Sequence, residues 1–325
     1  MRIIEVKSPM KGMINMNNNI IITMMIAFLL ILIPAGNISA QERMTINDEQ
    51  KNVGIYMKEW SDLDNFPITP DIIAWFENWY GPNSFLKLNL CAENHTAIPL
   101  ITWQPQNVPL REIADGIHDG YITNFLQNIT NMVPDIDVLI RFAHEMEVRP
   151  QYRFSWYSWQ GERDPEAYIE AWRHIVTLAR QINPNIKWIW SPNRADQYSD
   201  PYYPGDEYVD YISVTMNLRE DDANYTKYND FRSYYETIGI REHLEKYGKK
   251  IFISEVGYSN PKEEEKQTYI ESIFTYYMQD PLITAMIFFD ENSSDNSQYK
   301  ITDNPRLLEA FNEGFRRIVE ERNQE

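Results

Sequence analysis

The sequence is poor in cysteine and in basic residues, and each shortage argues against a class of protein. Cys91 is the only cysteine among 325 residues. No intrachain disulfide can form, so the core must stabilise the fold. The 30 lysines and arginines are outnumbered by 48 acidic residues, which leaves a net charge of −18. Nucleic-acid binding needs clustered basic side chains that neutralise phosphates, so we expect no nucleic acid partner.

A long transmembrane run is also missing. The apolar run at residues 20–33 is shorter than the roughly 20 residues that span a bilayer. Lysines precede it, and Pro34 and the small residues up to Ala40 follow, an order typical of a secretory signal. We predict a signal peptide at 1–40, cleaved near Ala40, and one catalytic domain at 41–325 that is secreted or extracellular. An N-terminal membrane anchor through residues 20–33 is the alternative.

Eight short β-rich runs alternate with segments of helical periodicity. This alternation predicts a parallel sheet. Eight repeats in a chain near the ~250 residues typical of a (β/α)8 barrel favour a closed TIM barrel of the α/β class. The clearest helix begins at Asp164-Pro165, an N-cap followed by a first-turn proline. Gly248 is expected to end another helix in a left-handed conformation. The predicted strands are residues 53–56, 72–76, 99–103, 138–142, 188–190, 208–214, 251–254 and 285–289.

Glutamates follow two of these runs. Reactive residues of such barrels lie at the C-terminal ends of strands. Glu145 follows the fourth run and Glu255 follows the seventh. A retaining glycosidase needs two carboxyls roughly 5 Å apart, because one attacks the anomeric carbon while the other protonates the leaving oxygen and then deprotonates water. A single glutamate after a strand is as often part of a structural salt bridge, but two on these strands favour a catalytic pair.

Five short segments, in this order and spacing, resemble glycoside hydrolase family 26, which contains many β-mannanases. They read PLITWQP at 99–105, RFAHEM at 141–146, WSPN at 190–193, YYPGD at 202–206 and SEVG at 254–257. The resemblance extends from residue 53 to residue 289. It implies a (β/α)8 barrel and double displacement, with Glu145 as acid/base and Glu255 as nucleophile. We expect no cofactor and no metal.

The resemblance also implies a set of substrate-binding residues. His144 is expected to line the cleavage subsite and to bond the nucleophile or the substrate. The fixed charge of Arg141 is expected to hold the nucleophile ionised. Aromatic rings after the acid/base are expected to stack on sugars. The predicted site consists of catalytic Glu145 and Glu255, with Arg141, His144, Trp103, Trp156, Tyr157, Trp159, Asn193 and Phe289 binding the substrate.

The chain departs from the family pattern at three places in the cleft. Glu147-Val148 stands where the family usually has Asn-Gly, and residues 214–217 read VTMN where the family ends its sixth strand with a tyrosine that positions the nucleophile. Residues 288–290 read FFD where an eighth-strand tryptophan is common. Mannan is the first candidate by the resemblance, but the polymer stays open, with β-1,3-linked xylan, mixed-linkage glucan or an unusual cell-surface glycan as alternatives.

Two other functions compete with this one. A zinc hydrolase would need a second histidine four residues after His144, where Val148 stands. A non-catalytic carbohydrate-binding protein on a degenerate barrel is suggested by the missing tyrosine and tryptophan. We favour a retaining β-glycoside hydrolase, most similar to an endo-β-1,4-mannanase. We expect a monomer that acts on a β-linked polysaccharide or oligosaccharide.

Overall fold

A computed structural model describes residues 43–58, 60–81, 85–94, 97–148, 157–219, 228, 230–293 and 296–324. The chain separates into two units, Met1–Gln41 and Glu42–Glu325. The described residues all belong to the second unit. The predicted signal segment lies outside them.

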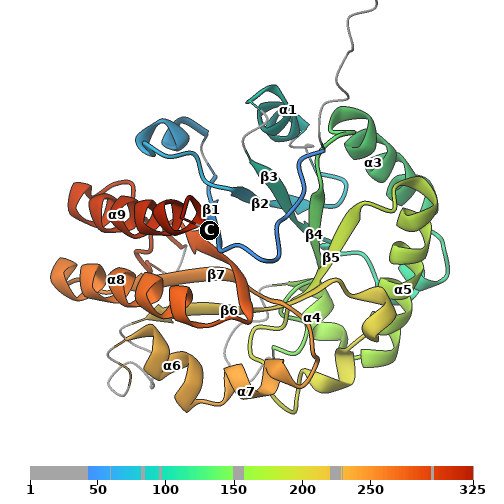
Figure 1. The fold of residues 1–325 in the computed structure, drawn as a ribbon. Helices are drawn as coiled ribbons and strands as arrows, with labels where there is room; N and C mark the ends of the chain where they lie inside the picture. The colour runs from blue at the N-terminus through green and yellow to red at the C-terminus, as the bar shows by residue number, and fades with distance from the viewer. Residues whose placement is uncertain are drawn as a thin grey trace, which may run out of the picture. The chain divides into compact units, whose positions relative to one another are not determined.

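Eight parallel strands close into a barrel in sequence order, and β1 pairs with both β2 and β8. The predicted TIM barrel is therefore confirmed. Helices lie around the outside of the strands (Figure 1). The strands are β1 (Asn52–Tyr56), β2 (Ile72–Asn78), β3 (Ile98–Gln104), β4 (Val138–Phe142), β5 (Ile186–Trp190), β6 (Tyr211–Arg219), β7 (Ile251–Ser259) and β8 (Ile283–Phe289).

Each predicted strand corresponds to an observed one, but the predicted bounds of β6 and β7 are wrong. Tyr208 lies in a 3-10 helix, and β6 begins only at Tyr211. β7 continues five residues beyond Ser254, so Glu255 lies inside the strand rather than after it. Both β6 and β7 extend past the point where their apolar pattern stops, because polar side chains line the mouth of the barrel there. A prediction based on apolar runs ends such strands too early.

The helices return the chain between strands, and their caps agree with the sequence. Asp164 accepts a hydrogen bond from the Ala167 N–H at 3.0 Å and Pro165 stands in the first turn, as predicted. Gly248 has a φ of 63°, also as predicted. The described helices are α1 (Phe85–Asn94), α2 (Leu110–Ala114), α3 (Asp119–Met132), α4 (Ser158–Glu162), α5 (Pro165–Ile182), α6 (Phe231–Thr237), α7 (Ile240–Glu245), α8 (Glu263–Gln279) and α9 (Pro305–Arg322), with 3-10 helices η1 (Trp60–Asn65), η2 (Asp200–Tyr202) and η3 (Asp206–Tyr208).

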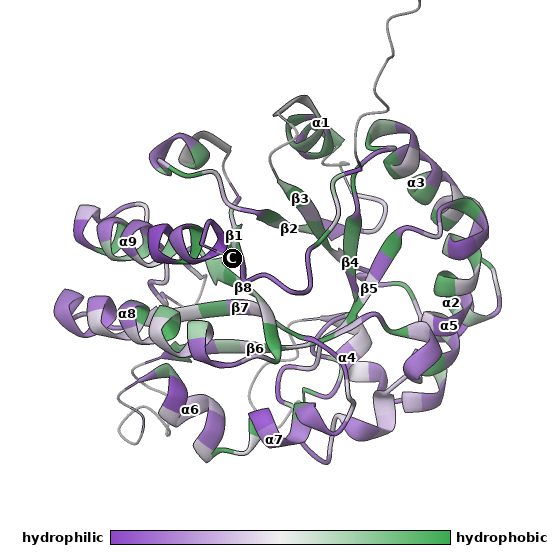
Figure 2. Ribbon diagram, viewed as in Figure 1, coloured by the Kyte–Doolittle hydropathy of each residue, from purple (hydrophilic) through white to green (hydrophobic). Residues whose placement is uncertain are grey.

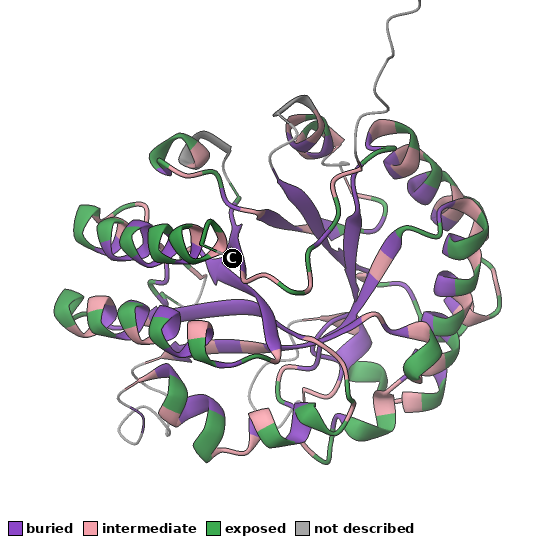
Figure 3. Ribbon diagram, in the orientation of Figure 1, coloured by how far each residue is buried: buried purple, intermediate pink, exposed green. Residues whose placement is uncertain are grey.

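The core consists of the strands and the helix faces that cover them. Apolar residues concentrate on the strands, while the outer faces of α5, α8 and α9 are polar (Figure 2). The strands are buried almost throughout, and exposed residues lie on the outer sides of the helices (Figure 3). None of the helices in the described ranges combines the length and the apolar composition that crossing a bilayer requires.

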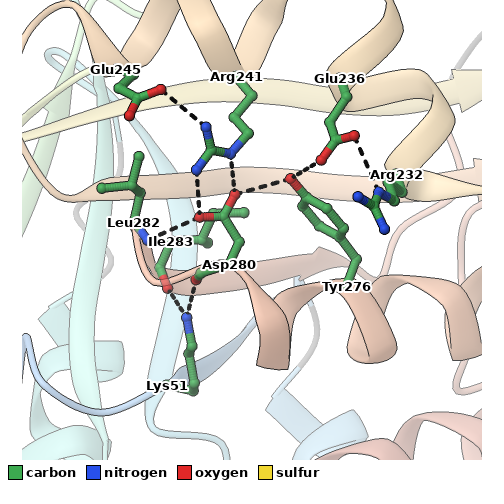
Figure 4. A network of polar contacts seen from close by, with 9 residues as sticks. All are labelled: Lys51, Arg232, Glu236, Arg241, Glu245, Tyr276, Asp280, Leu282 and Ile283. Carbon is green, nitrogen blue, oxygen red and sulfur yellow. Dashed lines mark hydrogen bonds and ion pairs between the residues drawn. The ribbon is translucent and has the colours of Figure 1, made fainter.

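A polar network joins the elements near the amino ends of β1 and β8 (Figure 4). The buried Asp280 carboxylate accepts hydrogen bonds from Arg241 Nε at 2.7 Å, the Tyr276 hydroxyl at 3.0 Å and the Leu282 N–H at 2.9 Å. Lys51 donates to the main-chain carbonyl of the same aspartate. The network therefore ties α7, α8 and the residues before β1 and β8 together.

Candidate active site

β4 brings three predicted side chains to the mouth of the barrel. Arg141 lies inside the strand, and His144 and Glu145 follow its end. Ala143 and Glu145 adopt left-handed backbone conformations, with φ of 40° and 56°. Each such residue costs about 1–3 kcal/mol unless the surroundings hold it. The Glu145 N–H donates to the Ser191 carbonyl at 2.8 Å, just beyond β5. This bond secures the turn that carries the Glu145 carboxylate.

A register shift between β6 and β7 sets the direction of the second carboxylate. Val214 pairs with Ile253, whereas Thr215 pairs with Glu255, so Ser254 is an extra residue on β7. The Ser254 N–H donates to the hydroxyl of Ser213 at 3.1 Å. Side chains alternate along a strand, so one extra residue reverses the face to which the next residue points. The bulge therefore brings Glu255 beside Thr215 at the barrel mouth.

The two predicted catalytic carboxylates lie close together. One oxygen of Glu145 and one oxygen of Glu255 are within 4.8 Å of each other, and both side chains are buried. Retaining glycosidases hold their carboxyls about 5–5.5 Å apart, while inverting enzymes leave about 6.5–9.5 Å for a water molecule. The observed proximity of the two carboxylates agrees with the retaining geometry.

A buried arginine organises the pair. Arg141, 1% exposed, donates from Nη1 to Glu255 Oε1 at 2.5 Å and from Nε to the Ser191 hydroxyl at 2.8 Å. Its Nη2 donates to Thr215 Oγ1 at 3.0 Å. Asn217 Nδ2 donates to the second oxygen of Glu255 at 3.1 Å. Both oxygens of Glu255 are thus held by donors that favour its ionised form.

Burial and these donors act on Glu255 in opposite directions. Burial raises the pKa of Glu255, and the like charge of Glu145 adds to the rise. The charge of Arg141 and the hydrogen bonds from Arg141 and Asn217 oppose it. Because a guanidinium remains charged throughout the physiological pH range, Arg141 is the group that keeps Glu255 available as an anion.

His144 is a neutral side chain in contact with the pair. A ring nitrogen of His144 lies within 4.8 Å of an oxygen of each carboxylate. Burial, reinforced by the charge of Arg141, holds the pKa of His144 well below its usual value. Neither ring nitrogen has a hydrogen-bond partner within the described ranges, and the side chain is fully buried. Buried imidazoles seldom lack partners, so these nitrogens are suited to receive a polar group of a ligand.

Aromatic rings line the same mouth. Tyr56, at the end of β1, lies 4.6 Å from Phe76 and 4.8 Å from Phe289 between ring centroids. Tyr157 lies 4.7 Å from the ring of His144. Burial raises the pKa of Tyr56 and of Tyr157. The charge of Glu255 raises both further, and that of Glu145 adds to the rise for Tyr157, so both hydroxyls keep their protons. Phe289 and Tyr157 therefore lie among the residues that line the mouth, and their contact with substrate stays a prediction.

Two predicted substrate-binding tryptophans lie elsewhere. Trp103 is fully buried on the outer side of β3 and stacks on Phe125 of α3 at 4.6 Å. Its neighbours on the strand, not Trp103 itself, point into the barrel, because strand residues alternate. Trp159 is 1% exposed, lies beneath Tyr157 and donates to the His144 carbonyl at 2.8 Å. It therefore supports the acid/base turn and offers no face to a sugar.

The remaining predicted residues are not all described. Trp156 lies outside the described residues. Asn193 follows β5 and is partly buried, and its substrate contact stays a prediction.

Sequence reasoning missed four residues of the site. Thr215 and Asn217 were treated only as the replacement of a tyrosine, although their spacing of two places both on one face of β6. Tyr56 ends a strand, so the rule that located Glu145 also applies to it. The fourth residue, Glu147, accepts a hydrogen bond from the Arg194 N–H at 2.6 Å, and burial raises its pKa to about 8. Glu147 is only partly buried, but its second oxygen is inaccessible, and nothing in the sequence indicates this.

His144, Glu145 and Glu255 are also the one cluster within the described ranges whose atoms could hold a metal ion. The guanidinium of Arg141, 2.5 Å from Glu255, already neutralises that carboxylate and repels a cation. The donor set therefore fits an ion pair better than a metal centre.

A closed barrel with two carboxylates this close at its mouth has the architecture of a retaining (β/α)8 glycosidase. Comparison with known proteins agrees. The model of glycosyl hydrolase family 26 matches residues 110–275, which include both carboxylates. The chain belongs to glycosyl hydrolase family 26.

Two curated relatives share parts of the sequence. Endoglucanase H of Acetivibrio thermocellus is 25% identical over 323 residues, which cover 90% of this chain and 33% of that protein. Mannan endo-1,4-beta-mannosidase A and B of Caldalkalibacillus mannanilyticus is 31% identical over 115 residues, 32% of this chain and 19% of that protein. The chain thus spans a third or less of the length of these relatives.

Solved structures support the fold. Bacillus subtilis mannanase man26 has a TM-score of 0.58 and 14% identity, covering 81% of this chain and 84% of that one. GH26C from Muricauda sp. has a TM-score of 0.57 and 16% identity, covering 83% and 86%.

Proposed function

We propose that this chain is a retaining β-glycoside hydrolase that acts on a β-linked polysaccharide, with mannan as the first candidate. The observation that carries the proposal is the pair of carboxylates within 4.8 Å, one of which is ion-paired with a buried arginine. The family to which the chain belongs, and relatives named as a mannosidase and an endoglucanase, support the same chemistry.

In the proposed first step, Glu255 attacks the anomeric carbon while Glu145 protonates the departing oxygen. Arg141 and Asn217 hold Glu255 as an anion aimed into the mouth. In the second step, Glu145 takes a proton from water, and the water releases the sugar from Glu255 with net retention. His144 supplies an unpartnered donor and acceptor for a sugar hydroxyl.

Hydrolysis of a panel of β-mannans, xylans and glucans by the full chain tests this proposal. Glu145→Gln and Glu255→Gln each keep the size of the side chain, and each should lower turnover by roughly 10³-fold or more, as expected for removing a reacting group. Glu245→Gln, on the exposed carboxylate of α7, is the matched control and should retain full turnover. Proton NMR of the first product should show the β-anomer.

Binding of oligosaccharide without turnover, unchanged by either active-site substitution, would instead support a carbohydrate-binding protein. An α-anomeric first product would contradict the retaining mechanism. Export of the chain and its monomeric state remain our predictions, the former supported by the apolar run at residues 20–33.

A further inference from the structure

Thr215 lies between the two halves of the catalytic site. Its Oγ1 receives a hydrogen bond from Arg141 Nη2 at 3.0 Å and donates to Glu145 Oε1 at 2.6 Å. Arg141 is at the same time 2.5 Å from Glu255. A single hydroxyl thus connects the proposed acid/base to the arginine that is paired with the proposed nucleophile.

The direction of these hydrogen bonds follows from the donors available. Arginine has N–H donors and no acceptor, so the hydroxyl oxygen of Thr215 must accept from Arg141. Threonine has one proton, and the remaining close partner in the described ranges is Glu145 Oε1. Because Oε1 already accepts a hydrogen bond from Thr215, the catalytic proton of Glu145 belongs on Oε2.

We propose that Thr215 is a positioning residue that assigns the two oxygens of Glu145 different tasks. Oε1 is held by Thr215, and Oε2 carries the proton to the glycosidic oxygen and later takes one from water. This inference rests on the proposed function, and it adds a residue that the tyrosine pattern of the sixth strand does not include.

The same hydrogen bonds link the two chemical steps. Before the reaction, the charge of Arg141 is balanced by Glu255. When Glu255 forms its covalent bond to the sugar, that negative charge disappears while the guanidinium stays charged. Thr215 then lies between an unbalanced cation and the carboxylate that Glu145 becomes once it has given its proton to the departing oxygen. The base needed for the second step is therefore produced by completion of the first.

Comparing kcat/KM on two classes of substrate distinguishes a role of Thr215 in acid catalysis from a general structural role. A polysaccharide has a poor leaving group that needs protonation, whereas a 2,4-dinitrophenyl β-glycoside releases 2,4-dinitrophenolate, which departs without a proton. The valine variant Thr215→Val keeps the shape and removes the hydroxyl. It should lower kcat/KM for the polymer about 10–100-fold, within the range of acid catalysis, and change kcat/KM for dinitrophenyl β-mannobioside or β-cellobioside less than about threefold.

Hydrolysis of the glycosyl-enzyme, the second chemical step, provides an independent test of the role of Thr215. Loss of base assistance in Thr215→Val should lower kcat on the dinitrophenyl substrate, and azide, a nucleophile that needs no base, should restore it with release of a glycosyl azide. Thr215→Ser keeps the hydroxyl and should return both substrates to within about threefold of the parent. Thermal unfolding of each variant checks that the fold is intact.

Ser191→Ala is the matched control, because it removes the other hydroxyl that Arg141 contacts and does not touch Glu145 Oε1. It should affect both substrate classes equally. Equal losses on both classes in Thr215→Val, or no loss on either, would overturn the role of Thr215 while leaving the proposed function intact. A parent chain silent on every substrate would overturn the proposed function and this inference with it.

Discussion

At the scale of single residues, the buried ion pair of Arg141 with Glu255 determines when the proposed nucleophile is charged. Burial raises the pKa of Glu255 and Arg141 opposes the rise. Arg141→Met removes the opposing charge, so the pKa of Glu255 should increase further. Because the nucleophile must be ionised, activity is lost below that pKa. The acid limb of the kcat/KM profile should therefore move to higher pH by at least about one unit.

A lysine at the same position provides the control. Arg141→Lys keeps the charge but cannot reach Glu255, Ser191 and Thr215 together, because lysine has a single nitrogen. Its acid limb should stay near that of the parent while kcat falls. An unshifted acid limb in Arg141→Met would show that the arginine does not set the ionisation of Glu255.

A site residue could be predicted from the sequence when its residue type occurs in few structural environments. Glu145 and Glu255 were located because reactive residues of such barrels lie at the carboxyl ends of strands, and both glutamates directly follow apolar runs. Trp103 was misplaced because it was taken from the family resemblance at residues 99–105 without regard to the alternation of faces along the strand. Thr215 and Asn217 were missed because threonine and asparagine occur in many environments. Their role depends on a bulge that the sequence does not reveal.

At the scale of secondary-structure elements, the contact between α8 and α9 depends on one glycine. A methyl group on Gly314 of α9 would overlap the ring of Phe274 in α8. That ring is fully buried and lies 5.1 Å from Phe288 of β8. Gly314→Ala should therefore destabilise the fold by about 1–3 kcal/mol, although alanine is the better helix former.

A second helical glycine gives the opposite expectation. Nothing lies within 4 Å of a methyl group on Gly120 in α3, so Gly120→Ala should stabilise by about 0.5–1 kcal/mol through helix propensity alone. Urea unfolding of both variants measures the difference. Equal stabilities of the two variants would mean that the α8–α9 contact yields to the extra methyl group.

The elements themselves were predictable to the extent that they are apolar. Strands β1 to β5 and β8 lie close to the predicted runs because buried strands of a barrel are nearly continuous in apolar residues. The carboxyl ends of β6 and β7 were not predictable, because polar residues take the place of apolar ones at the barrel mouth. These residues are Thr215, Asn217 and Glu255. A prediction based on apolar residues therefore ends these strands before the residues of the site.

At the scale of the whole molecule, the two ends of the barrel carry different tasks. The carboxylates lie at the carboxyl end of the strands, and the polar network around Asp280 lies near the amino ends of β1 and β8 (Figure 4). Barrels of this kind generally have their active site at the carboxyl ends of the strands, while residues at the amino ends contribute to stability. The number and order of the eight repeats predicted this arrangement, whereas the network, built from residues far apart in sequence, was not predictable.

The division can be tested by removing the central carboxylate of the network. Asp280→Ala leaves the partly buried Arg241 without its closest partner, and the Leu282 N–H and Tyr276 hydroxyl each lose an acceptor. Breaking such a pair from one side costs about 3–5 kcal/mol when it is fully buried. Arg241 is 27% exposed, so we expect about 2–3 kcal/mol by urea unfolding.

Glu245→Ala removes the other carboxylate that pairs with Arg241, at 3.0 Å. The side chain of Glu245 is 55% exposed, so its loss should lower the free energy of unfolding by no more than about 0.5 kcal/mol. Below the unfolding transition both variants should hydrolyse polysaccharide with the kcat of the parent, because no residue of the network reaches the barrel mouth. A loss of kcat in folded Asp280→Ala protein would mean that the amino end of the barrel controls the geometry of the carboxylates. In that case stability and chemistry would be coupled through the strands, and the two ends could not be treated as independent.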